Sequence, residues 1–427
     1  MQLKANKTNL KAMLTTASCA LLGSAANAST EESWQFDTAI MHYAEVDRVS
    51  ATEAIIAGTK TFNNDEVLNL KITIDALTGA SPNGATAQPT PQTFTRPSGN
   101  GQYTVNEGDT PLDDTFHDTR VQLTGQWTQP LLKDYTVSVG GNFSKEYDYM
   151  SASLNGNVAR DFNKKNTTLS AGMAYAYDVI EPEGGIPKPL SEMDVGDSND
   201  PNFNDDFNKT RIASDESKST IDLLFGVTQV INRQMIVQLN YSYSTVSGYM
   251  TDPFKIISSI NNNGEAQAYL YENRPDERTK HAFFGQTKYH FDSGILDASY
   301  RFMTDDWQID SHTFDFRYFI PFTNGHFIEP HFRMYTQSAA EFYQPFIAQH
   351  EAKPNFVSAD YRIGELDTYT VGLKYGMPMG DGNNLSFRLE YYHQTPKSNG
   401  IQAIGVLKEV ELYEEVDAII AQVTYSF

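Results

Sequence analysis

The chain has 427 residues, and its 54 acidic and 32 basic side chains give a formal net charge of −22. A chain this acidic repels phosphate backbones, which argues against nucleic acid as a partner. Hydrophobic residues make up 40% of the chain, yet no uncharged apolar run reaches the roughly 18 residues that a membrane helix needs. This excludes a bundle of membrane-spanning helices.

The first 28 residues predict a secretory signal peptide. Lys4, Lys7 and Lys11 form a basic leader, an apolar stretch follows, and Ala26-Asn27-Ala28 provides a cleavage site of small residues. The single cysteine, Cys19, lies inside this leader. A mature chain without cysteine has neither disulfides nor thiolate metal ligands. We therefore expect an exported protein with a signal peptide over residues 1–28 and one domain over residues 29–427.

The mature region consists of short segments in which apolar and polar residues alternate, the pattern of strands with one apolar face. Strands are predicted at 34–45, 49–61, 66–77, 115–128, 135–146, 150–162, 166–178, 218–231, 234–247, 278–291, 295–304, 306–320, 325–337, 364–377, 383–395 and 411–427. The chain also has 24 Tyr and 25 Phe, as expected for aromatic girdles around a barrel. We expect an all-β fold, a transmembrane antiparallel up-and-down β-barrel of about 16 strands with a polar lumen. The first two strands are the weakest assignments, so fourteen strands is the alternative.

The connections between these segments alternate in length. Short turns are predicted near 62–65, 129–134, 163–165, 232–233, 292–294, 321–324 and 378–382, and long connections at 78–114, 179–217, 248–277, 338–363 and 396–410. Outer-membrane barrels have short periplasmic turns and longer external loops. We therefore expect both termini in the periplasm and every long connection outside the cell.

The last strand carries the sharpest single pattern. Val423, Tyr425 and Phe427 share one face, and the sequence ends on the aromatic residue. This resembles the C-terminal signal of outer-membrane barrels, which implies the barrel-assembly machinery as a partner during biogenesis. The alternative is an ordinary amphipathic edge strand, which in a soluble protein would expose a flat apolar edge to aggregation. Together with the leader, the pattern predicts the bacterial outer membrane, with its lipid and lipopolysaccharide as surroundings.

Three runs carry a family resemblance: Asp47-Arg48-Val49-Ser50, then Asp75-Ala76-Leu77-Thr78-Gly79-Ala80-Ser81-Pro82-Asn83-Gly84-Ala85, and Phe116-His117-Asp118-Thr119-Arg120. They resemble an uncharacterised family of proteobacterial outer-membrane proteins, a domain of unknown function. The resemblance implies a barrel without assigning an activity. Members of the family are often encoded beside a flavin transferase and a small lipoprotein, which implies an envelope redox or assembly role and an envelope lipoprotein as a candidate partner.

The segment with Gly79, Ser81, Pro82, Asn83 and Gly84 follows a predicted strand, and its Gly and Pro-Asn-Gly chemistry favours tight turns. Two interpretations stay open, a constriction loop that folds back into the barrel and an ordered external loop. A phosphate-binding glycine loop is disfavoured because no helix follows whose N-terminus could hold the anion.

Charges of both signs occupy the polar faces of the predicted strands. The lumen candidates are Lys71, Asp75, Asp118, Arg120, Arg301, Asp315, Arg317, Glu329, Arg333, Arg388 and Glu390. They can pair across neighbouring strands and brace the wall, or they can set up a transverse field that orients a polar solute. Asp75, Asp118 and Arg120 are the preferred site, because they fall on adjacent strands beside the glycine-containing loop.

The connection at 179–217 is rich in carboxylates, and Asp194, Asp197, Asp200, Asp205 and Asp206 are its candidate metal ligands. Clustered carboxylates are ligands for hard cations such as Ca²⁺, although the spacing is not that of an EF-hand. A solvated acidic loop is the simpler interpretation, and bridging to lipopolysaccharide through divalent ions lies between the two. No other cofactor is expected.

Sixteen strands make a barrel wide enough for a water-filled channel. The sequence therefore favours a channel or solute-conducting barrel with a mixed-charge lumen. The alternative is a non-conducting envelope scaffold, or an assembly or redox accessory protein that binds a periplasmic or lipoprotein partner. An enzyme is not expected, because the strand histidines occur without a Gly-x-Ser-x-Gly nucleophile elbow.

Overall fold

The computed structural model describes residues 33–196, 199–380 and 382–427. Within these residues, sixteen strands close into one antiparallel barrel in which each strand pairs with the next barrel strand along the chain. β1 (Ser33–Glu45) pairs with β23 (Val416–Ser426) and closes the ring. The all-β, up-and-down prediction is confirmed. The alternative of fourteen strands is wrong, because β1 also pairs along its length with β2 (Val49–Thr61).

The remaining barrel strands are β3 (Val67–Pro82), β6 (Leu112–Leu132), β7 (Tyr135–Lys145), β8 (Tyr149–Phe162), β9 (Thr167–Ile180), β12 (Glu216–Val230), β13 (Met235–Gly248), β16 (Glu277–Phe291), β17 (Gly294–Asp305), β18 (Asp310–Pro321), β19 (Phe327–Gln337), β21 (Leu366–Gly380) and β22 (Asn383–Pro396). β3 and β6 run further than the alternation predicts, because their pairing continues past a bulge near Gly79 to the pair Pro82 and Leu112. β23 starts later than predicted, after the short 3-10 helix η3 (Gly405–Glu409).

The alternation of side chains separates an apolar outer face from a polar inner face. On β3, Ile72 and Ile74 are 45% and 48% exposed, whereas Thr73 and Asp75, which alternate with them, are buried. Large apolar residues are exposed on most other barrel strands in the same way, among them Leu239, Phe283, Val371 and Leu389. A barrel with apolar side chains outside and polar ones inside is the arrangement expected of a strand wall in lipid.

Aromatic side chains gather at both ends of the outer face. At the end with short turns, Phe36 stacks on Trp34 and on Phe427, each at 5.5 Å between ring centroids. Near the end with long loops, the Tyr300 hydroxyl contacts His312 Nδ1 at 2.8 Å, and Tyr241 contacts His281 in the same way. Aromatic belts of this kind flank the apolar band of membrane barrels.

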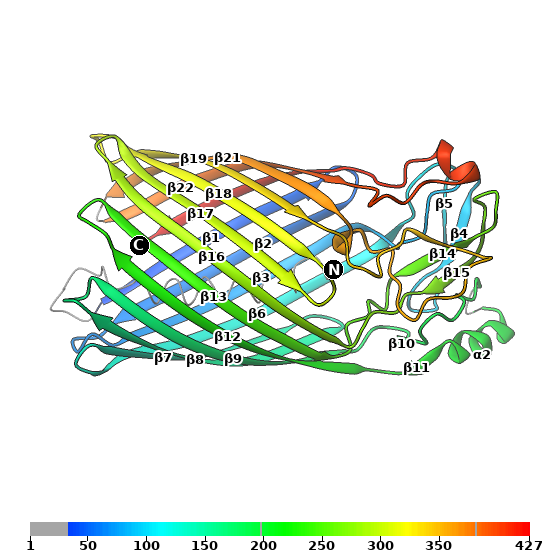
Figure 1. Ribbon diagram of the computed structural model, residues 1–427, viewed down its shortest axis with the longest axis horizontal. Coiled ribbons are helices and arrows are strands. Elements are labelled where there is room, and N and C mark those ends of the chain that lie inside the picture. Colours follow the sequence, from blue (N-terminus) through cyan, green and yellow to red (C-terminus); the bar gives the residue numbers. More distant parts are fainter. Residues whose placement is uncertain (1–32, 197–198, 381) are drawn as a thin grey trace.

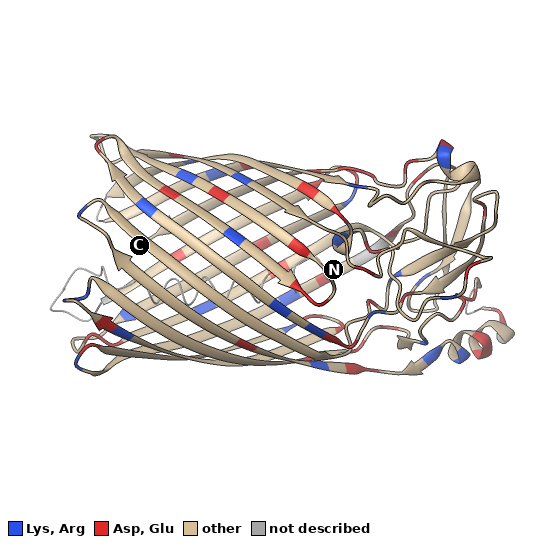
Figure 2. Cartoon of the chain, in the orientation of Figure 1, with Lys and Arg blue, Asp and Glu red and all other residues tan. Residues whose placement is uncertain are grey.

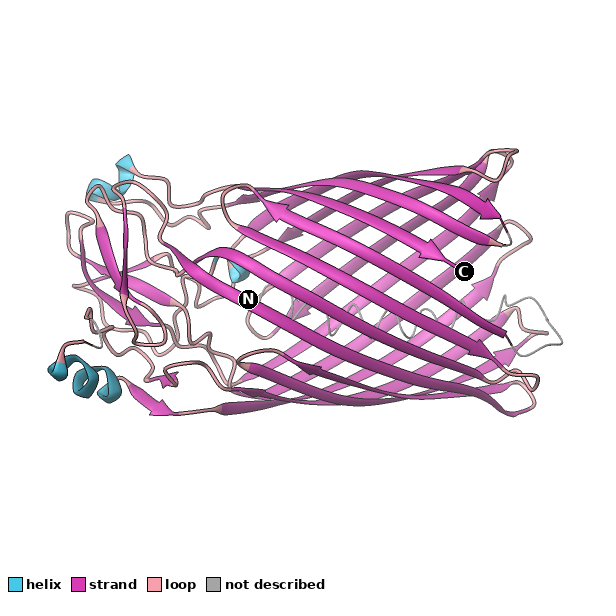
Figure 3. Ribbon diagram, turned by 180° about the vertical axis from the view of Figure 1, so that it is seen from behind, coloured by secondary structure: helices cyan, strands magenta, loops and turns pink. Residues whose placement is uncertain are grey.

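The long connections pack together at one end of the barrel, beyond the ends of its strands (Figure 1; Figure 3). We call these connections, 83–111, 181–215, 249–276, 338–365 and 397–415, the loop cap. It contains β4 (Gln92–Thr95), β5 (Gln102–Val105), β10 (Ile186–Pro187), α2 (Pro201–Lys209), β11 (Arg211–Ala213), β14 (Ile256–Ile260), β15 (Ala266–Tyr271), β20 (Phe346–Ala348), the 3-10 helix η2 (Tyr361–Ile363) and η3. Its interior is fully buried at Phe94, Ile257, Ile260, Val357 and Leu407. The cap therefore has a hydrophobic core of its own.

The sequence pattern assigned every long connection to one end of the barrel, and the structure confirms this sorting. The predicted signal peptide lies outside the described residues. Among the residues that the structure describes, none forms a helix of sufficient length and apolarity to cross a membrane.

Candidate functional site

A row of charged side chains crosses four neighbouring strands on the inner face of the barrel. Asp75 of β3 lies opposite Glu53 of β2 on one side and opposite Arg120 of β6 on the other. Arg120 Nε donates to Asp75 Oδ2 at 2.8 Å and lies 3.9 Å from Glu146 Oε1, just beyond the end of β7. Its terminal nitrogen lies 3.8 Å from Glu53. The structure thus brings Asp75 and Arg120 together and adds two carboxylates that the sequence reasoning missed.

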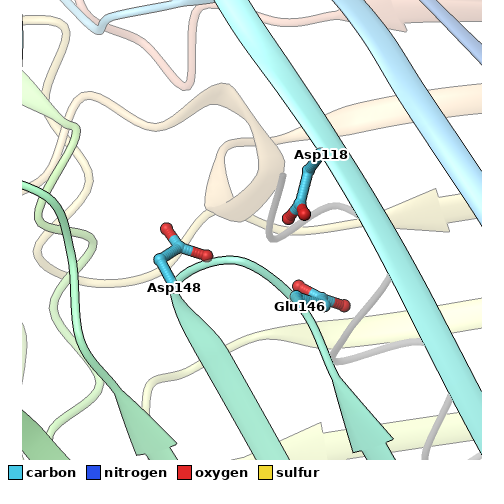
Figure 4. A group of neighbouring side chains, drawn as sticks. All are labelled: Asp118, Glu146 and Asp148. Carbon is cyan, nitrogen blue, oxygen red and sulfur yellow. The ribbon is translucent and has the colours of Figure 1, made fainter.

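Asp118 lies on the same face of β6 as Arg120 but takes part in a different group. Its Oδ1 accepts a hydrogen bond from the backbone N–H of Tyr147 at 3.2 Å, and this places Glu146 and Asp148 on either side of it (Figure 4). Ligand oxygens of Asp118, Glu146 and Asp148 all lie within 4.8 Å of one another. Burial, reinforced by the charge of Asp118, raises the pKa of Glu146 to about 7 and that of Asp148 to about 6. We call these three residues the carboxylate triad.

A second network lies on β18 to β22. His331 of β19 contacts Asp315 Oδ2 through Nε2 at 3.1 Å and Glu390 Oε1 through Nδ1 at 2.8 Å. Glu390 reaches across β21 because Gly372 stands between the two strands. A Cβ at Gly372 would lie 2.4 Å from the Glu390 side chain. Arg317 lies 3.4 Å from Asp315.

The other predicted lumen residues extend this second network. Arg333 lies opposite Asp315, and Glu329 lies opposite Lys374, which in turn lies opposite Arg388. Arg301 is on the same wall, on β17, and its Nε is buried without a hydrogen-bond partner among the described residues. Lys374 was missed although it alternates with apolar neighbours on a predicted strand. Lys71 lies on β3, beside the first row.

The two walls therefore carry different balances of charge. On β2 to β7 and the turn that follows, carboxylates outnumber cations: Glu53, Asp75, Asp118, Glu146 and Asp148 against Lys71 and Arg120. On β16 to β22 cations outnumber carboxylates: Arg278, Lys280, Lys288, Arg301, Arg317, Arg333, Lys374 and Arg388 against Asp297, Asp305, Asp315, Glu329 and Glu390. The charged positions follow the strands along the barrel (Figure 2). β23 and β1 separate the two walls on one side, and β8, β9, β12 and β13 on the other.

The segment from Gly79 to Gly84 fastens the loop cap to the barrel. Asn83 is held at both backbone groups, because its N–H donates to Pro111 and its carbonyl accepts from Ile256 N–H at 2.8 Å. Gly84 has a φ of +98°, and a Cβ there would lie 2.3 Å from the Ile256 carbonyl oxygen. The Ser81 hydroxyl lies 3.5 Å from Lys255 Nζ, which also donates to the Pro82 carbonyl. The sequence left open a constriction loop inside the barrel and an ordered external loop. This geometry corresponds to an ordered loop at the end of the barrel.

Within the cap lies a buried network of charged side chains that the sequence reasoning missed. Arg362 Nε donates to both carboxylate oxygens of Asp360, at 2.7 and 2.8 Å, and its terminal nitrogen contacts Asp252 at 2.7 Å. Arg274 lies 2.6 Å from Glu272 and 2.8 Å from Asp360. Although burial raises it, the pKa of Asp360 is held well below its usual range by Arg362 and Arg274. An acid two residues before an arginine occurs in both contributing loops, Glu272-Asn273-Arg274 and Asp360-Tyr361-Arg362, and this repeat was the available signal.

The acidic connection has mainly structural contacts. Asp200 caps the N-terminus of α2 by accepting from Asn202 N–H at 3.0 Å, and Asp206 pairs with Lys209 at 2.5 Å. Within the part of the chain that the structure describes, the carboxylate triad is the one group of three such side chains close enough to share an ion, and Asp194, Asp200, Asp205 and Asp206 are not in it. Asp197 lies outside the described residues.

The end of the chain joins the two edges of the sheet. Val423 and Tyr425 lie opposite Ile40 and Thr38 of β1. Phe427 exchanges two backbone hydrogen bonds with Phe36, at 2.8 and 2.9 Å, and stacks on Tyr425. The residues of the predicted assembly signal therefore close the barrel.

A closed barrel with an apolar outer face, a charged inner face and packed loops at one end is the architecture of outer-membrane β-barrels. A family model described as "Protein of unknown function (DUF3570)" matches residues 11–427, so the chain belongs to this family. The family resemblance inferred from the sequence is confirmed. No curated protein matches the chain.

Solved structures with a similar fold share very little sequence. A bacterial polysaccharide outer membrane secretin is 8% identical with a TM-score of 0.42, covering 92% of this chain and 98% of its own. The outer membrane protein opdK of Pseudomonas aeruginosa is 8% identical with a TM-score of 0.38, covering 93% and 99%. The ferric enterobactin receptor (PfeA) of the same organism is 7% identical with a TM-score of 0.44, covering 92% of this chain and 60% of the receptor.

Proposed function

We propose that this protein is an outer-membrane channel that conducts small polar solutes through a lumen with segregated charge. The observation that carries the proposal is the unequal charge of the two walls: an excess of carboxylates on β2 to β7 and the turn that follows, and an excess of cations on β16 to β22. Charges that served only to brace the wall would be expected to balance locally. Walls of opposite sign create a field across the lumen, and this field acts on dipolar and charged solutes more strongly than it would in bulk water.

The membrane orientation follows from the distribution of turns and loops. The apolar outer face and its two aromatic belts lie in the lipid, and the loop cap faces the cell surface among lipopolysaccharide. An epitope tag at Asn263, in the cap, is expected to be accessible to antibody on intact cells, whereas a tag at Asn163, in a short turn, is not. Reversed accessibility would overturn this orientation.

The channel proposal is tested by single-channel recording of the full chain refolded into a planar bilayer. We expect discrete conductance steps and a reversal potential, under a salt gradient, that depends on lumen charge. Asp75→Asn should shift selectivity toward anions and Arg317→Gln toward cations, each by about twofold in the permeability ratio. Lys209→Gln serves as the control, because Lys209 is on α2 in the cap and pairs only with a neighbouring surface carboxylate. Refolded wild-type protein that inserts but conducts nothing would overturn the proposal.

One observation favours a second candidate. The loop cap has a packed core and a buried ion network, so it forms a rigid surface rather than a set of free loops. Such a surface is what a non-conducting scaffold would present to a partner such as an envelope lipoprotein. The same recordings separate the candidates, because a scaffold assembles normally and remains electrically silent.

A further inference from the structure

Three carboxylates from two chain segments converge at the end of the lumen beside the loop cap. Asp118 comes from β6, and Glu146 and Asp148 come from the turn between β7 and β8. Figure 4 shows their carboxyl groups turned toward a common space from three sides. Their ligand oxygens lie within 4.8 Å of one another, so one ion can contact all three. Like charges held this close repel one another unless a cation lies between them.

A second observation comes from Asp118 itself. The residue is buried, with only 7% of its surface exposed, and its Oδ2 has no hydrogen-bond donor among the described residues. The other oxygen is satisfied by the Tyr147 backbone N–H. A buried carboxylate oxygen without a donor is unfavourable and calls for an explanation. A bound cation supplies one, because the Asp118 carboxyl group is turned toward Glu146 and Asp148 (Figure 4).

The nearest arginine is engaged elsewhere. Arg120 makes its short contacts with Asp75, at 2.5 and 2.8 Å, and it approaches Glu146 only at 3.9 Å. It therefore neutralises the neighbouring row of the wall and leaves most of the triad's charge uncompensated.

We propose that Asp118, Glu146 and Asp148 form a binding site for a hard divalent cation, with Ca²⁺ as the preferred ion. All three ligands are oxygen donors, and Ca²⁺ takes six to eight such ligands at variable geometry, so three carboxylates and water complete its shell. Mg²⁺ demands a near-ideal octahedron at shorter distances, which carboxylates from a strand and a separate turn do not provide as readily. The bound ion joins the β7–β8 turn to β6 and lowers the negative charge at this end of the lumen. The site does not depend on whether the barrel conducts.

The experiment uses the full chain refolded in detergent from material free of lipopolysaccharide. Binding of Tb³⁺ is followed by its luminescence, sensitised by Tyr147 and Tyr149 beside the triad, and the ion is then displaced with Ca²⁺ or Mg²⁺. Calorimetry with Ca²⁺ gives the affinity directly. We expect a dissociation constant of about 10⁻⁴ to 10⁻³ M for Ca²⁺, the range of extracellular modules, and weaker competition by Mg²⁺.

Variants decide where the ion binds. Asp148→Asn and Glu146→Gln, both in the turn, should each weaken Ca²⁺ binding by about tenfold or more, because each removes one of three charged ligands. Asp205→Asn and Asp206→Asn in α2 are the matched controls and should bind as wild type does. Heat modifiability confirms that each variant has folded. Absence of saturable binding up to about 10 mM Ca²⁺, equal binding by all variants, or loss of binding only in the α2 variants would overturn the proposal.

Discussion

The barrel wall and the loop cap bury polar groups in different ways. In the wall, charged side chains face a lumen and pair with residues directly opposite on neighbouring strands, as Asp75 does with Arg120. In the cap, Arg274, Arg362, Glu272 and Asp360 are almost fully buried and are drawn from two connections far apart in sequence. The wall is held by a continuous backbone ladder, whereas the cap depends on its side chains.

Because of this difference, substitutions of charged side chains should affect the stability of the two regions differently. Loss of one charged contact leaves the strand ladder of the wall intact, because backbone hydrogen bonds do not depend on side-chain identity. The cap resembles a small globular domain, because it has three clusters of buried apolar residues in addition to its buried charged side chains. Removal of one charged side chain there leaves its partners buried and unpaired, which costs far more stability than the loss of a charged contact in the wall. The cap should therefore loosen as a unit while the barrel persists.

The largest effect is expected where the two edges of the barrel meet. Deletion of Phe427 removes two backbone hydrogen bonds to Phe36 and the ring that stacks between Phe36 and Tyr425, so β23 closes poorly on β1. We expect most of the protein to be lost as degraded or aggregated periplasmic material, measured by fractionation and heat modifiability. Phe427→Tyr, which keeps the ring and backbone, is the control. Normal amounts of folded barrel after the deletion would contradict the assembly role of this residue.

The next effect separates cap from wall. Arg362→Met leaves Asp360 and Asp252 without their main cation, and removing one partner of a buried pair typically costs about 3–5 kcal/mol. We expect rapid proteolysis within the cap and an unchanged heat-modifiable barrel core. Lys397→Met is the matched control, because Lys397 is 41% exposed and pairs with Glu365 and Asp367 at the surface, where such pairs contribute about 0–1 kcal/mol. Loss of the barrel together with the cap would show that the two regions fold as one.

The wall was predictable from sequence, and the cap was not. Period-two alternation at residues such as Leu70, Ile72 and Ile74 fixes both the strand and its lipid face, and register with the next strand then places Asp75 near Arg120. Both inferences need only the alternation within one strand and its pairing with the next barrel strand along the chain. Asp118 was predicted to join them, but a turn of three residues carries Glu146 and Asp148 to it instead, and alternation contains no information about turns.

The cap joins residues separated by about a hundred positions, as in the pair Arg362 and Asp252. Polar loop residues that form a buried network have the same composition as residues that remain in water, so composition cannot separate them. α2 is a smaller case. Asp200-Pro201 is an N-cap followed by a first-turn proline, a recognised helix start, which the sequence analysis did not use.

A smaller effect tests the attachment between the two regions. Gly84→Ala places a Cβ against the Ile256 carbonyl at a φ of +98°, and the combined strain and clash should cost about 1–3 kcal/mol. Hydrogen exchange at Ile256, whose N–H donates to Asn83, should increase. Gly108→Ala in the same connection has a similar φ of +81° but no atom within 4 Å of the new Cβ, so it reports the backbone cost alone. Equal effects of the two variants would mean that the close approach to β14 does not hold the cap.

The smallest effect is the response of the cap to acid. Asp252, Lys255, Glu272, Arg274 and Arg362 surround Asp360. Burial raises the pKa of Asp360, but Arg362 and Arg274 lower it further, so its folded pKa lies below the unfolded value of about 3.9. Its contribution to stability is therefore complete above about pH 4 and is lost only as the pH falls through the folded pKa.

Glu272 acts in the opposite direction, because burial raises its pKa and protonation during mild acidification then favours the folded cap. Burial lowers the pKa of Lys255, so its protonated form disfavours the folded cap, and this cost is relieved as the pH rises toward the ordinary lysine range. Between pH 7 and pH 5 neither carboxylate weakens the cap, and protease resistance of the loops should stay constant or rise slightly. In Arg362→Met the main cation that lowers the Asp360 pKa is gone, so the cap, already weaker at pH 7, should become more resistant as Asp360 takes up a proton. A wild-type cap that opens between pH 7 and pH 5 would show that its stability rests on groups outside this network.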